Sequence, residues 1–459
     1  MQVAYLVQVR SAAMPSLNLS AFVASWLDKR LNKSLNRRTF EARQLRKFRA
    51  LAHILRARSP YYARIMDERR IEPARCRPQD FPVLTKADVI QHFDEIITAP
   101  EVTKGAVTDF LSQSHDAADL FRGRYIIVHS SGTTGEPGCF VYSSREWSWG
   151  GAALCDLRGF GVLSTRRRKV AFIGATRDHL AGISIMSTFR SAVLRPFFEF
   201  ASFDVNYPFH RVVDGLNAFQ PDLLVGYGLA LATLAERQLN GELVIRPMIV
   251  TNSGEAISKA DRDRVKLAFG VDVRNVYTSS EHMFMAVQEP DSAAMRLLED
   301  DLIFEFFPDH TLVTNLFNRT LPLIRYRMGD ALDVDVDLNV NAPYKAVREI
   351  TGRAEQAPFF VNKHGERDWL SPHLIYSFVV KNVQRHQLVQ LNETSFVFSV
   401  VLGSALSDQD RRETVMAVRN RLLEILTEKG MENVNFQINE VSDIWADQKT
   451  GKFLMIMKA

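Results

Sequence analysis

The feature that most constrains the fold is an alternation of short apolar strands with amphipathic helices along the middle of the chain. In the clearest unit, residues 248–252 predict a buried strand. Ser258 then caps a predicted helix that ends at Gly270, and residues 271–277 predict a second strand. A strand, a helix and a strand at this spacing indicate a parallel crossover. Several such units predict an open α/β sheet whose ligand site lies beyond the carboxyl ends of its strands.

Three polar segments directly follow predicted strands. Residues 130–135 follow a strand at 125–129, while residues 253–255 and 278–281 follow the two strands of the crossover. A further strand is predicted at 169–174. Because the carboxyl ends of parallel strands lie at one edge of a sheet, the three polar segments are expected to converge on one rim.

The pattern changes beyond residue 350. Residues 387–402 alternate like an exposed strand pair, residues 408–429 predict a long amphipathic helix, and residues 434–441 predict another strand. This is the size of a small α+β domain. The predicted fold is therefore α/β, with mixed or parallel sheets and flanking helices in a large domain and a small α+β lid at the C-terminus. The predicted boundaries are 1–38 for an N-terminal extension, 39–351 for the large domain and 352–459 for the lid.

Composition excludes several classes of function. The 459 residues carry a formal charge of +4, which is too slight to indicate nucleic acid but suits anionic substrates gathered at a cleft. In a basic helix predicted at 39–59, the aromatic Phe48 shares the apolar face with Leu45, Leu51 and Leu55 and does not lie on the charged face, so a solvated charged face is the preferred interpretation. Three cysteines without a C-x-x-C pair favour a reducing, cytoplasmic compartment. No apolar run is long enough to cross a bilayer, so no membrane partner is predicted.

The segment His129-Ser-Ser-Gly-Thr-Thr-Gly-Glu-Pro-Gly138 is the most informative part of the chain. Its glycines let the backbone approach phosphate oxygens closely, and its hydroxyls add hydrogen-bond donors. It is not the usual nucleoside-triphosphatase loop, because no Gly-Lys-Ser/Thr follows at the required spacing.

The segment resembles the pyrophosphate-binding signature of the adenylate-forming superfamily, which includes acyl-CoA synthetases and luciferases. Other motifs of that superfamily follow in order: Ser253-Gly-Glu255, Tyr277-Thr-Ser-Ser-Glu281, Arg325-Tyr-Arg-Met-Gly-Asp330, Gly352-Arg-Ala-Glu355 and Thr450-Gly-Lys452. Near the N-terminus, Ser59-Pro-Tyr-Tyr62 and Phe81-Pro-Val-Leu-Thr-Lys-Ala-Asp88 resemble segments of the phenylacetate–CoA ligase family, which also holds coenzyme F390 synthetases and capsule-biosynthesis relatives.

This resemblance implies a role for each matching residue. Asp330 would accept hydrogen bonds from the ribose hydroxyls of ATP, Tyr277 would stack on adenine, and Glu281 would hold Mg²⁺ against the phosphates. Thr133 and Thr134 would bind the leaving phosphates. The other predicted nucleotide-binding residues are Ser130, Ser131, Gly132, Gly135, Ser253, Gly254, Glu255, Thr278, Ser279, Ser280 and Arg353.

Lys452 and Glu281 are the predicted catalytic residues. When a carboxylate attacks the α-phosphorus, a mobile ammonium stabilises the charge that builds on the bridging oxygens, which is the role implied for Lys452. Glu355 lies at the position of the hinge on which the lid would turn. Tyr227, Gly228 and His282 are candidates for the wall of the acyl pocket.

The sequence also departs from the superfamily pattern. Position 138 is Gly where many relatives carry Lys, which removes one phosphate cation, and position 278 is Thr in place of Gly. Glu355 replaces the hinge aspartate. These departures indicate a divergent subgroup.

The implied reaction is ATP-dependent activation of a small carboxylic acid, with an aryl acid favoured, as an acyl-adenylate. Coenzyme A would then accept the acyl group as a thioester. Two alternatives keep the adenylation step: AMP transfer to a non-thiol acceptor, as in F390 synthetases, or acyl transfer to a carrier protein. A silent nucleotide-binding protein and a nucleic-acid-binding protein are the remaining alternatives. The oligomeric state stays open, with a homodimer as one option.

Overall fold

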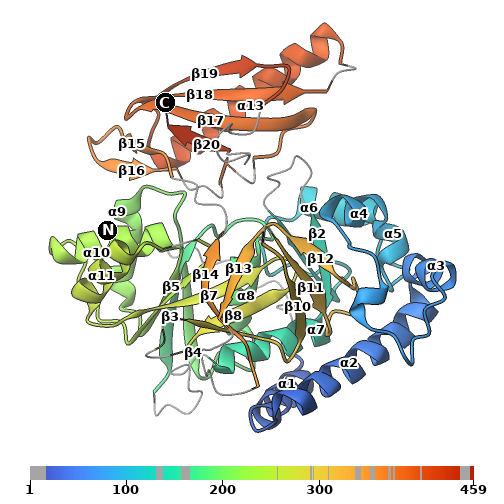
Figure 1. Ribbon diagram of the computed structural model, residues 1–459. Coiled ribbons are helices and arrows are strands. Elements are labelled where there is room, and N and C mark those ends of the chain that lie inside the picture. Colours follow the sequence, from blue (N-terminus) through green and yellow to red (C-terminus); the bar gives the residue numbers. More distant parts are fainter. Residues whose placement is uncertain are drawn as a thin grey trace.

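The computed structural model describes the chain except for residues 1–16, 131–137, 157–165, 256, 290, 291, 293, 309, 336–342, 352–356, 371–373, 376, 377, 404, 405, 445–454 and 459. The described residues form a large body that extends to strand β14 (Ala346–Thr351) and a smaller body that begins at β15 (Phe359–Val361) (Figure 1). Each body has an apolar core of its own. The exact boundary at 351–352 stays a prediction, because residues 352–356 lie outside the described part of the chain.

Helices build the N-terminal part of the large body, and local caps explain where they begin. A capping box begins α4: the Thr85 hydroxyl accepts from the Asp88 N–H at 3.2 Å, and the Asp88 carboxylate accepts from the Thr85 N–H at 2.8 Å. Ser59 ends one helix and caps the next, because Pro60 cannot continue the first. The helical elements are α1 (Leu19–Asn32), α2 (Arg37–Arg58), α3 (Pro60–Glu68), η1 (Pro78–Asp80), α4 (Lys86–Gln91), α5 (Phe93–Ile96) and α6 (Lys104–Gln113).

Within the described residues, the largest sheet has nine strands in the order β13-β14-β9-β8-β7-β6-β5-β3-β4. From β3 to β7 neighbouring strands are parallel, and from β7 to β13 they are antiparallel. The strands are β3 (Arg168–Gly174), β4 (Phe198–Asp204), β5 (Leu223–Gly226), β6 (Ile249–Ser253), β7 (Val273–Ser279), β8 (Met283–Gln288), β9 (Met295–Leu297), β13 (Ala331–Asp335) and β14.

The predicted crossover is confirmed as β6, α11 (Lys259–Phe269) and β7. The Ser258 hydroxyl accepts from the Asp261 N–H at 3.1 Å and so begins the helix. Gly270 ends it with a φ of +73°, which only glycine adopts without strain. The other helices of this region are α7 (Ser144–Gly151), η2 (Ala152–Asp156), α8 (Ala181–Ser187), η3 (Thr188–Arg190), α9 (Phe209–Phe219) and α10 (Gly228–Leu239).

Two small antiparallel sheets complete the large body. Strand β1 (Tyr125–His129) forms as predicted, but it pairs with β2 (Cys139–Ser143) and not with the large sheet. Strands β10 (Leu302–Phe306), β11 (Thr311–Asn315) and β12 (Tyr326–Met328) form the second sheet. The glycine-rich loop therefore connects the two strands of a hairpin.

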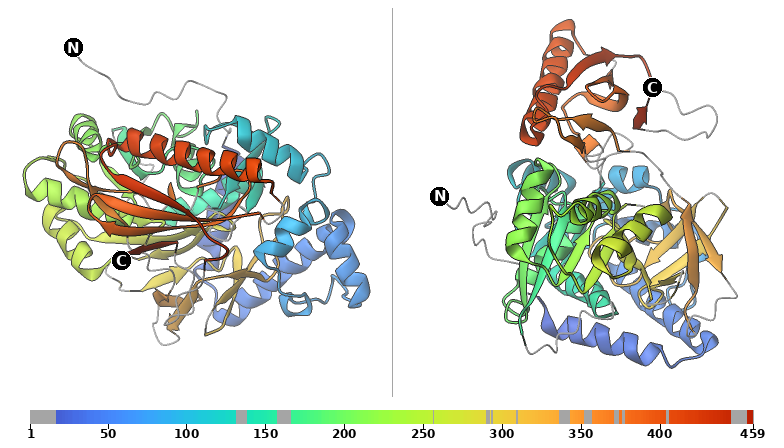
Figure 2. Two further views of the ribbon diagram at one scale, coloured as in Figure 1. Left: turned by 90° about the horizontal axis from the view of Figure 1, so that it is seen from above. Right: turned by 90° about the vertical axis from the view of Figure 1, so that its left-hand side faces the viewer.

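The smaller body has the predicted strand pair, long helix and further strand. Strand β17 (Val383–Asn392) pairs with β18 (Ser395–Leu402), helix α13 (Asp408–Lys429) follows, and β19 (Asn435–Glu440) joins the sheet parallel to β18. Strand β20 (Ile456–Lys458) adds to the other edge, and β15 pairs with β16 (Arg367–Trp369). Figure 2 shows this body stacked on the end of the large one. The predicted α/β fold class is confirmed.

Candidate functional site

The base of the glycine-rich loop is fixed by Ser130 and Gly138. The Ser130 N–H donates to the Gly138 carbonyl at 2.8 Å, and the Gly138 N–H donates to the Ser130 hydroxyl at 3.1 Å. The predicted phosphate ligands between them, Ser131, Gly132, Thr133, Thr134 and Gly135, lie outside the described residues. Both ends of the loop are thus held at the tip of the β1–β2 hairpin.

The segment after β7 meets this loop directly. The Ser280 hydroxyl donates to the His129 carbonyl at 3.1 Å, next to Ser130 in the chain. The Tyr142 hydroxyl on β2 donates to the Ser280 carbonyl at 2.8 Å, which ties the same segment to the other hairpin strand. Within the segment, the Ser279 hydroxyl accepts from the His282 N–H at 3.1 Å. The polar segments after β1 and β7 therefore converge as predicted, although β1 belongs to a separate two-stranded sheet.

The segments after β6 and β7 are also joined. Ser253 Oγ and Thr278 Oγ1 lie 3.0 Å apart and share a hydrogen bond across the ends of the two neighbouring strands. Gly254 follows with a φ of +86°, a conformation that favours glycine. The side chain of Thr278, which departs from the superfamily's glycine, thus has a partner on the neighbouring segment.

Tyr277 and Asp330, the predicted adenine and ribose ligands, contact each other. The Tyr277 hydroxyl donates to Asp330 Oδ2 at 2.6 Å, although 53 residues separate them in the chain. Asp330 lies between β12 and β13 and is half-buried. Its neighbour in the motif, Arg325, instead forms a two-pronged ion pair with Glu305, at 2.9 and 3.0 Å. That arginine is therefore part of the scaffold.

Glu281, the predicted Mg²⁺ ligand, has a carboxyl group that is withdrawn from bulk solvent. Burial raises its pKa, and the negative charge of Asp330 adds to the rise, while the positive charge of Lys86 opposes it. The Tyr326 hydroxyl donates to Glu281 Oε1 at 3.3 Å. In the described part of the chain, no group of three or more His, Cys, Asp or Glu residues is placed to hold a metal. A lone carboxylate fits Mg²⁺, which proteins often hold with one or two carboxylates and the substrate's phosphates.

Lys86 is a candidate that the motif comparison did not assign. A Cβ atom placed on Gly138 would lie 3.2 Å from Lys86 Cε and 3.1 Å from Phe140 Cζ. Lys86 lies at the start of α4. Its side chain thus lies beside the loop, next to the place that the Cβ atom of a larger residue at position 138 would take. The sequence shows a lysine at position 86, in the segment Phe81–Asp88, and a glycine at position 138 where many relatives carry lysine. Only the folded structure shows that these two positions are neighbours.

The residues predicted to wall the acyl pocket lie deeper than the nucleotide motifs. Tyr227 is buried, and its ring packs edge-on against Phe172 at 6.1 Å. Gly228 begins α10. His282 is fully buried, its ring nitrogens have no hydrogen-bond partner among the described residues, and burial lowers its pKa to about 3. His282 is therefore neutral, and its ring packs against Tyr326 at 5.8 Å.

Glu255 lies next to these residues. Its carboxylate accepts from the Leu229 N–H at 3.3 Å, in the first turn of α10, and burial raises its pKa to about 7. Lys452, Arg353 and Glu355 lie outside the described residues, so their roles stay predictions.

Comparisons with known proteins give the fold an independent test. No family model matches the chain. Protein CapK of Staphylococcus aureus is 31% identical over 147 residues, which is 30% of this chain and 32% of CapK. The match thus spans about a third of the length of that relative.

Solved structures match over most of the chain. A 2-hydroxyisobutyryl-CoA ligase with its acyl-AMP and CoA, in the thioesterification state, has a TM-score of 0.59 at 15% identity and covers 94% of this chain and 92% of its own. The same ligase in its postadenylation state has a TM-score of 0.53 at 16% identity, with coverage of 91% and 89%. The fold that the motifs implied is therefore confirmed: the chain has the fold of these acyl-CoA ligases.

Proposed function

We propose that the protein activates a small carboxylic acid with ATP and transfers the acyl group to coenzyme A. In the first step, a carboxylate oxygen bonds to the α-phosphorus, the bond from that phosphorus to the bridging oxygen breaks, and pyrophosphate leaves. In the second step, the CoA sulfur attacks the acyl carbonyl and AMP leaves. The observation that supports this most is the set of contacts that gathers four separate motifs: Ser280 with His129, Ser253 with Thr278, Tyr277 with Asp330, and Tyr326 with Glu281.

The side chains divide into those that hold the nucleoside and those that handle charge. Asp330 Oδ2 already accepts the Tyr277 hydroxyl, which leaves Oδ1 for a ribose hydroxyl and positions the Tyr277 ring for adenine. Lys86 would offer a cation on the phosphate side, beside Gly138. Mg²⁺ held by Glu281 would neutralise charge on the phosphates. Lys452 would stabilise the attacking carboxylate and the α-phosphate in the transition state.

The test is ATP–pyrophosphate exchange over a panel of small carboxylic acids, with aryl acids included. We expect at least one acid to support exchange, and Glu281→Gln to lower it by about a hundredfold or more. Because Glu281 is half-buried and desolvation raises its pKa, a neutral amide should leave folding intact. The matched control is Glu424→Gln, an exposed glutamate on α13. Lack of exchange with every acid, in protein that also fails to bind ATP, would refute the proposal.

A second set of reactions identifies the acceptor. Product analysis with CoA should show an acyl thioester and AMP. The same reaction with a phosphopantetheinylated carrier protein, or with a hydroxyl acceptor such as a deazaflavin and no thiol, tests the alternatives. If AMP becomes attached to the hydroxyl acceptor and CoA stays unmodified, the thioester step is wrong while the adenylation step stands.

A further inference from the structure

Helix α1 is amphipathic, but it turns polar residues toward the protein and apolar residues toward solvent, which is the reverse of the usual arrangement. The residues it turns toward the body of the protein include Ser25, Lys29 and Asn32, which are 0%, 2% and 1% exposed. A surface helix normally buries its apolar stripe and leaves charged residues in solvent. Here the polar face holds the helix in place.

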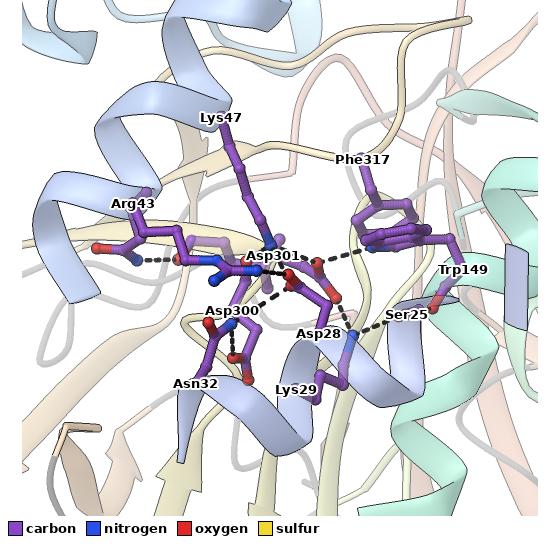
Figure 3. A network of polar contacts seen from close by, with 12 residues as sticks. Ser25, Asp28, Lys29, Asn32, Arg43, Lys47, Trp149, Asp300, Asp301 and Phe317 are labelled. Atoms are coloured by element: carbon purple, nitrogen blue, oxygen red, sulfur yellow. Dashed lines mark hydrogen bonds and ion pairs between the residues drawn. The ribbon is translucent and has the colours of Figure 1, made fainter. Parts of the chain in front are cut away.

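Buried hydrogen bonds and ion pairs make this attachment (Figure 3). Lys29 pairs with Asp301 and also donates to the Ser25 hydroxyl at 2.8 Å. Ser25 in turn donates to the Trp149 carbonyl at 2.8 Å, and Asn32 donates to Asp300 at 2.7 Å. Since Ser25, Lys29 and Asn32 each make a hydrogen bond or ion pair across the contact, the rotation of α1 about its axis is fixed.

The outward face of α1 is apolar as a consequence. Leu19, Val23, Leu27 and Leu31 recur every four residues along one side of the helix and are 52%, 40%, 47% and 61% exposed. We call these four residues the α1 stripe. Because the rotation of α1 is fixed, these four side chains cannot turn toward the rest of the protein and stay exposed. A continuous exposed apolar surface of this kind indicates an interaction site.

The charge around the α1 stripe narrows the choice of partner. Arg30 lies exposed beside it, with its guanidinium 5.2 Å from the centre of the Trp26 ring. Asp28 is the acidic residue of α1, but it pairs with Arg43 and with Lys47. The outward face of α1 therefore combines apolar residues with positive charge and presents no carboxylate.

We propose that the α1 stripe docks onto the surface of an anionic lipid bilayer. Leucine, valine and tryptophan enter the boundary between headgroups and acyl chains, while flanking arginines bind anionic headgroups. A second copy of the chain would offer Arg30 no carboxylate from the same face. Residues 1–16, which precede the stripe, contain no aspartate or glutamate either. Anionic lipid supplies the charge that both of these partners lack.

The position of α1 suits this role. Helix α1 lies at the opposite end of the molecule from the smaller body in both side views (Figures 1 and 2). A bilayer bound along α1 would therefore leave the candidate site and the smaller body free of lipid. The described helices include none that could span a membrane, so the contact would be at the surface.

Co-sedimentation of the full chain with vesicles tests the proposal. We expect binding to vesicles made of equal parts phosphatidylcholine and phosphatidylglycerol, weaker binding at high salt, and little binding to phosphatidylcholine alone. Leu27→Gln/Leu31→Gln should weaken binding by about tenfold or more, because two inserted side chains become polar. The control is Leu239→Gln/Leu267→Gln, which changes two leucines of similar exposure, 48% and 74%, elsewhere on the surface. This control should bind as the natural chain does.

Three results would overturn the proposal. One is equal binding by the α1 variant and its control. Another is a natural chain that binds no vesicles and is dimeric in size-exclusion chromatography, while the α1 variant is monomeric. That result would make the α1 stripe a contact between two copies of the chain. The third is binding that appears only after residues 1–16 are removed, which would show that the chain's own N-terminal segment occupies the stripe. ATP binding by the α1 variant should match the natural chain in all cases.

Discussion

Lys429, the last residue of α13, joins the two bodies through a buried charge. Its ammonium group lies 3.0 Å from the Asp368 carboxylate and donates to the carbonyls of Val205 and Tyr207, at 2.6 and 3.0 Å. The side chains of Lys429 and Asp368 are 0% and 3% exposed. Burial lowers the pKa of Lys429, and Asp368 opposes that shift. Neither charge can therefore be removed alone without leaving the other buried and without its partner.

The variant Lys429→Met should weaken this contact by about 3–5 kcal/mol, because it leaves Asp368 as a buried charge without its cation. The N–H groups of Phe209 and Trp369, at 3.2 and 2.8 Å, would still donate to Asp368, which argues for the lower end of that range. The double variant Lys429→Met/Asp368→Asn should recover most of the loss, since it removes both charges together.

Hydrogen exchange followed by mass spectrometry measures the effect locally. We expect amides at the end of α13 and around Val205 to exchange about a hundredfold faster or more in Lys429→Met, and to return to within about tenfold of the natural rate in the double variant. Lys381→Met, at an exposed lysine, is the control and should leave the rates unchanged. The reasoning is refuted if the single variant exchanges like the control, or if the double variant is no slower than the single one.

Three further predictions concern the site. Asp330→Asn should weaken ATP binding by about tenfold to a hundredfold in isothermal titration calorimetry, because a charged acceptor for a hydroxyl is lost; unchanged affinity would remove Asp330 from the ribose site. Glu255 has a pKa raised from 4.5 to about 7, so its neutral form stabilises the fold fully below pH 4.5, and this contribution is lost as pH rises past 7. Glu255→Gln should match the natural chain in acid and exceed its unfolding free energy by up to about 3 kcal/mol above pH 8, as measured by denaturant titration; a difference that does not change with pH would contradict this. Lys86→Met should lower ATP–pyrophosphate exchange by about tenfold or more, and adding Gly138→Lys should restore part of it; exchange that Lys86→Met leaves intact would show that Lys86 is not the replacement cation.

Local signals in the sequence predicted the regular elements well. The crossover from β6 to β7 was predictable because Ser258 and Gly270 mark the ends of its helix by chemistry confined to a few residues. Periodicity predicted the elements of the smaller body, namely the strand pair, the long helix and the further strand, because it too is a local property of the sequence. The pairing of β1 with β2 away from the large sheet was not predicted, because strand partners depend on contacts distant in sequence.

The candidate site shows the same division. The meeting of the segments at the ends of β6 and β7 followed from topology, and Ser253 and Thr278 contact each other there. The segment after β1 joins them through Ser280, but β1 lies outside the large sheet, so the sheet argument did not account for this contact. The contact of Tyr277 with Asp330 and the place of Lys86 are products of tertiary packing, which no local pattern encodes. The reversed orientation of α1 is likewise set by buried partners on distant segments, including Asp300 and Asp301.

The neighbourhood of Gly138 and Lys86 has a consequence for how such chains are compared. Aligned position by position, glycine at 138 counts as a deleted cation, and lysine at 86 belongs to a different segment. In the folded chain the two belong to one locus, since the end of one side chain lies where the other would have started. A lysine on the helix at position 86 can therefore put its ammonium group close to where a lysine on the loop at position 138 would put one. Searches for divergent members of this fold should compare the two positions as a pair.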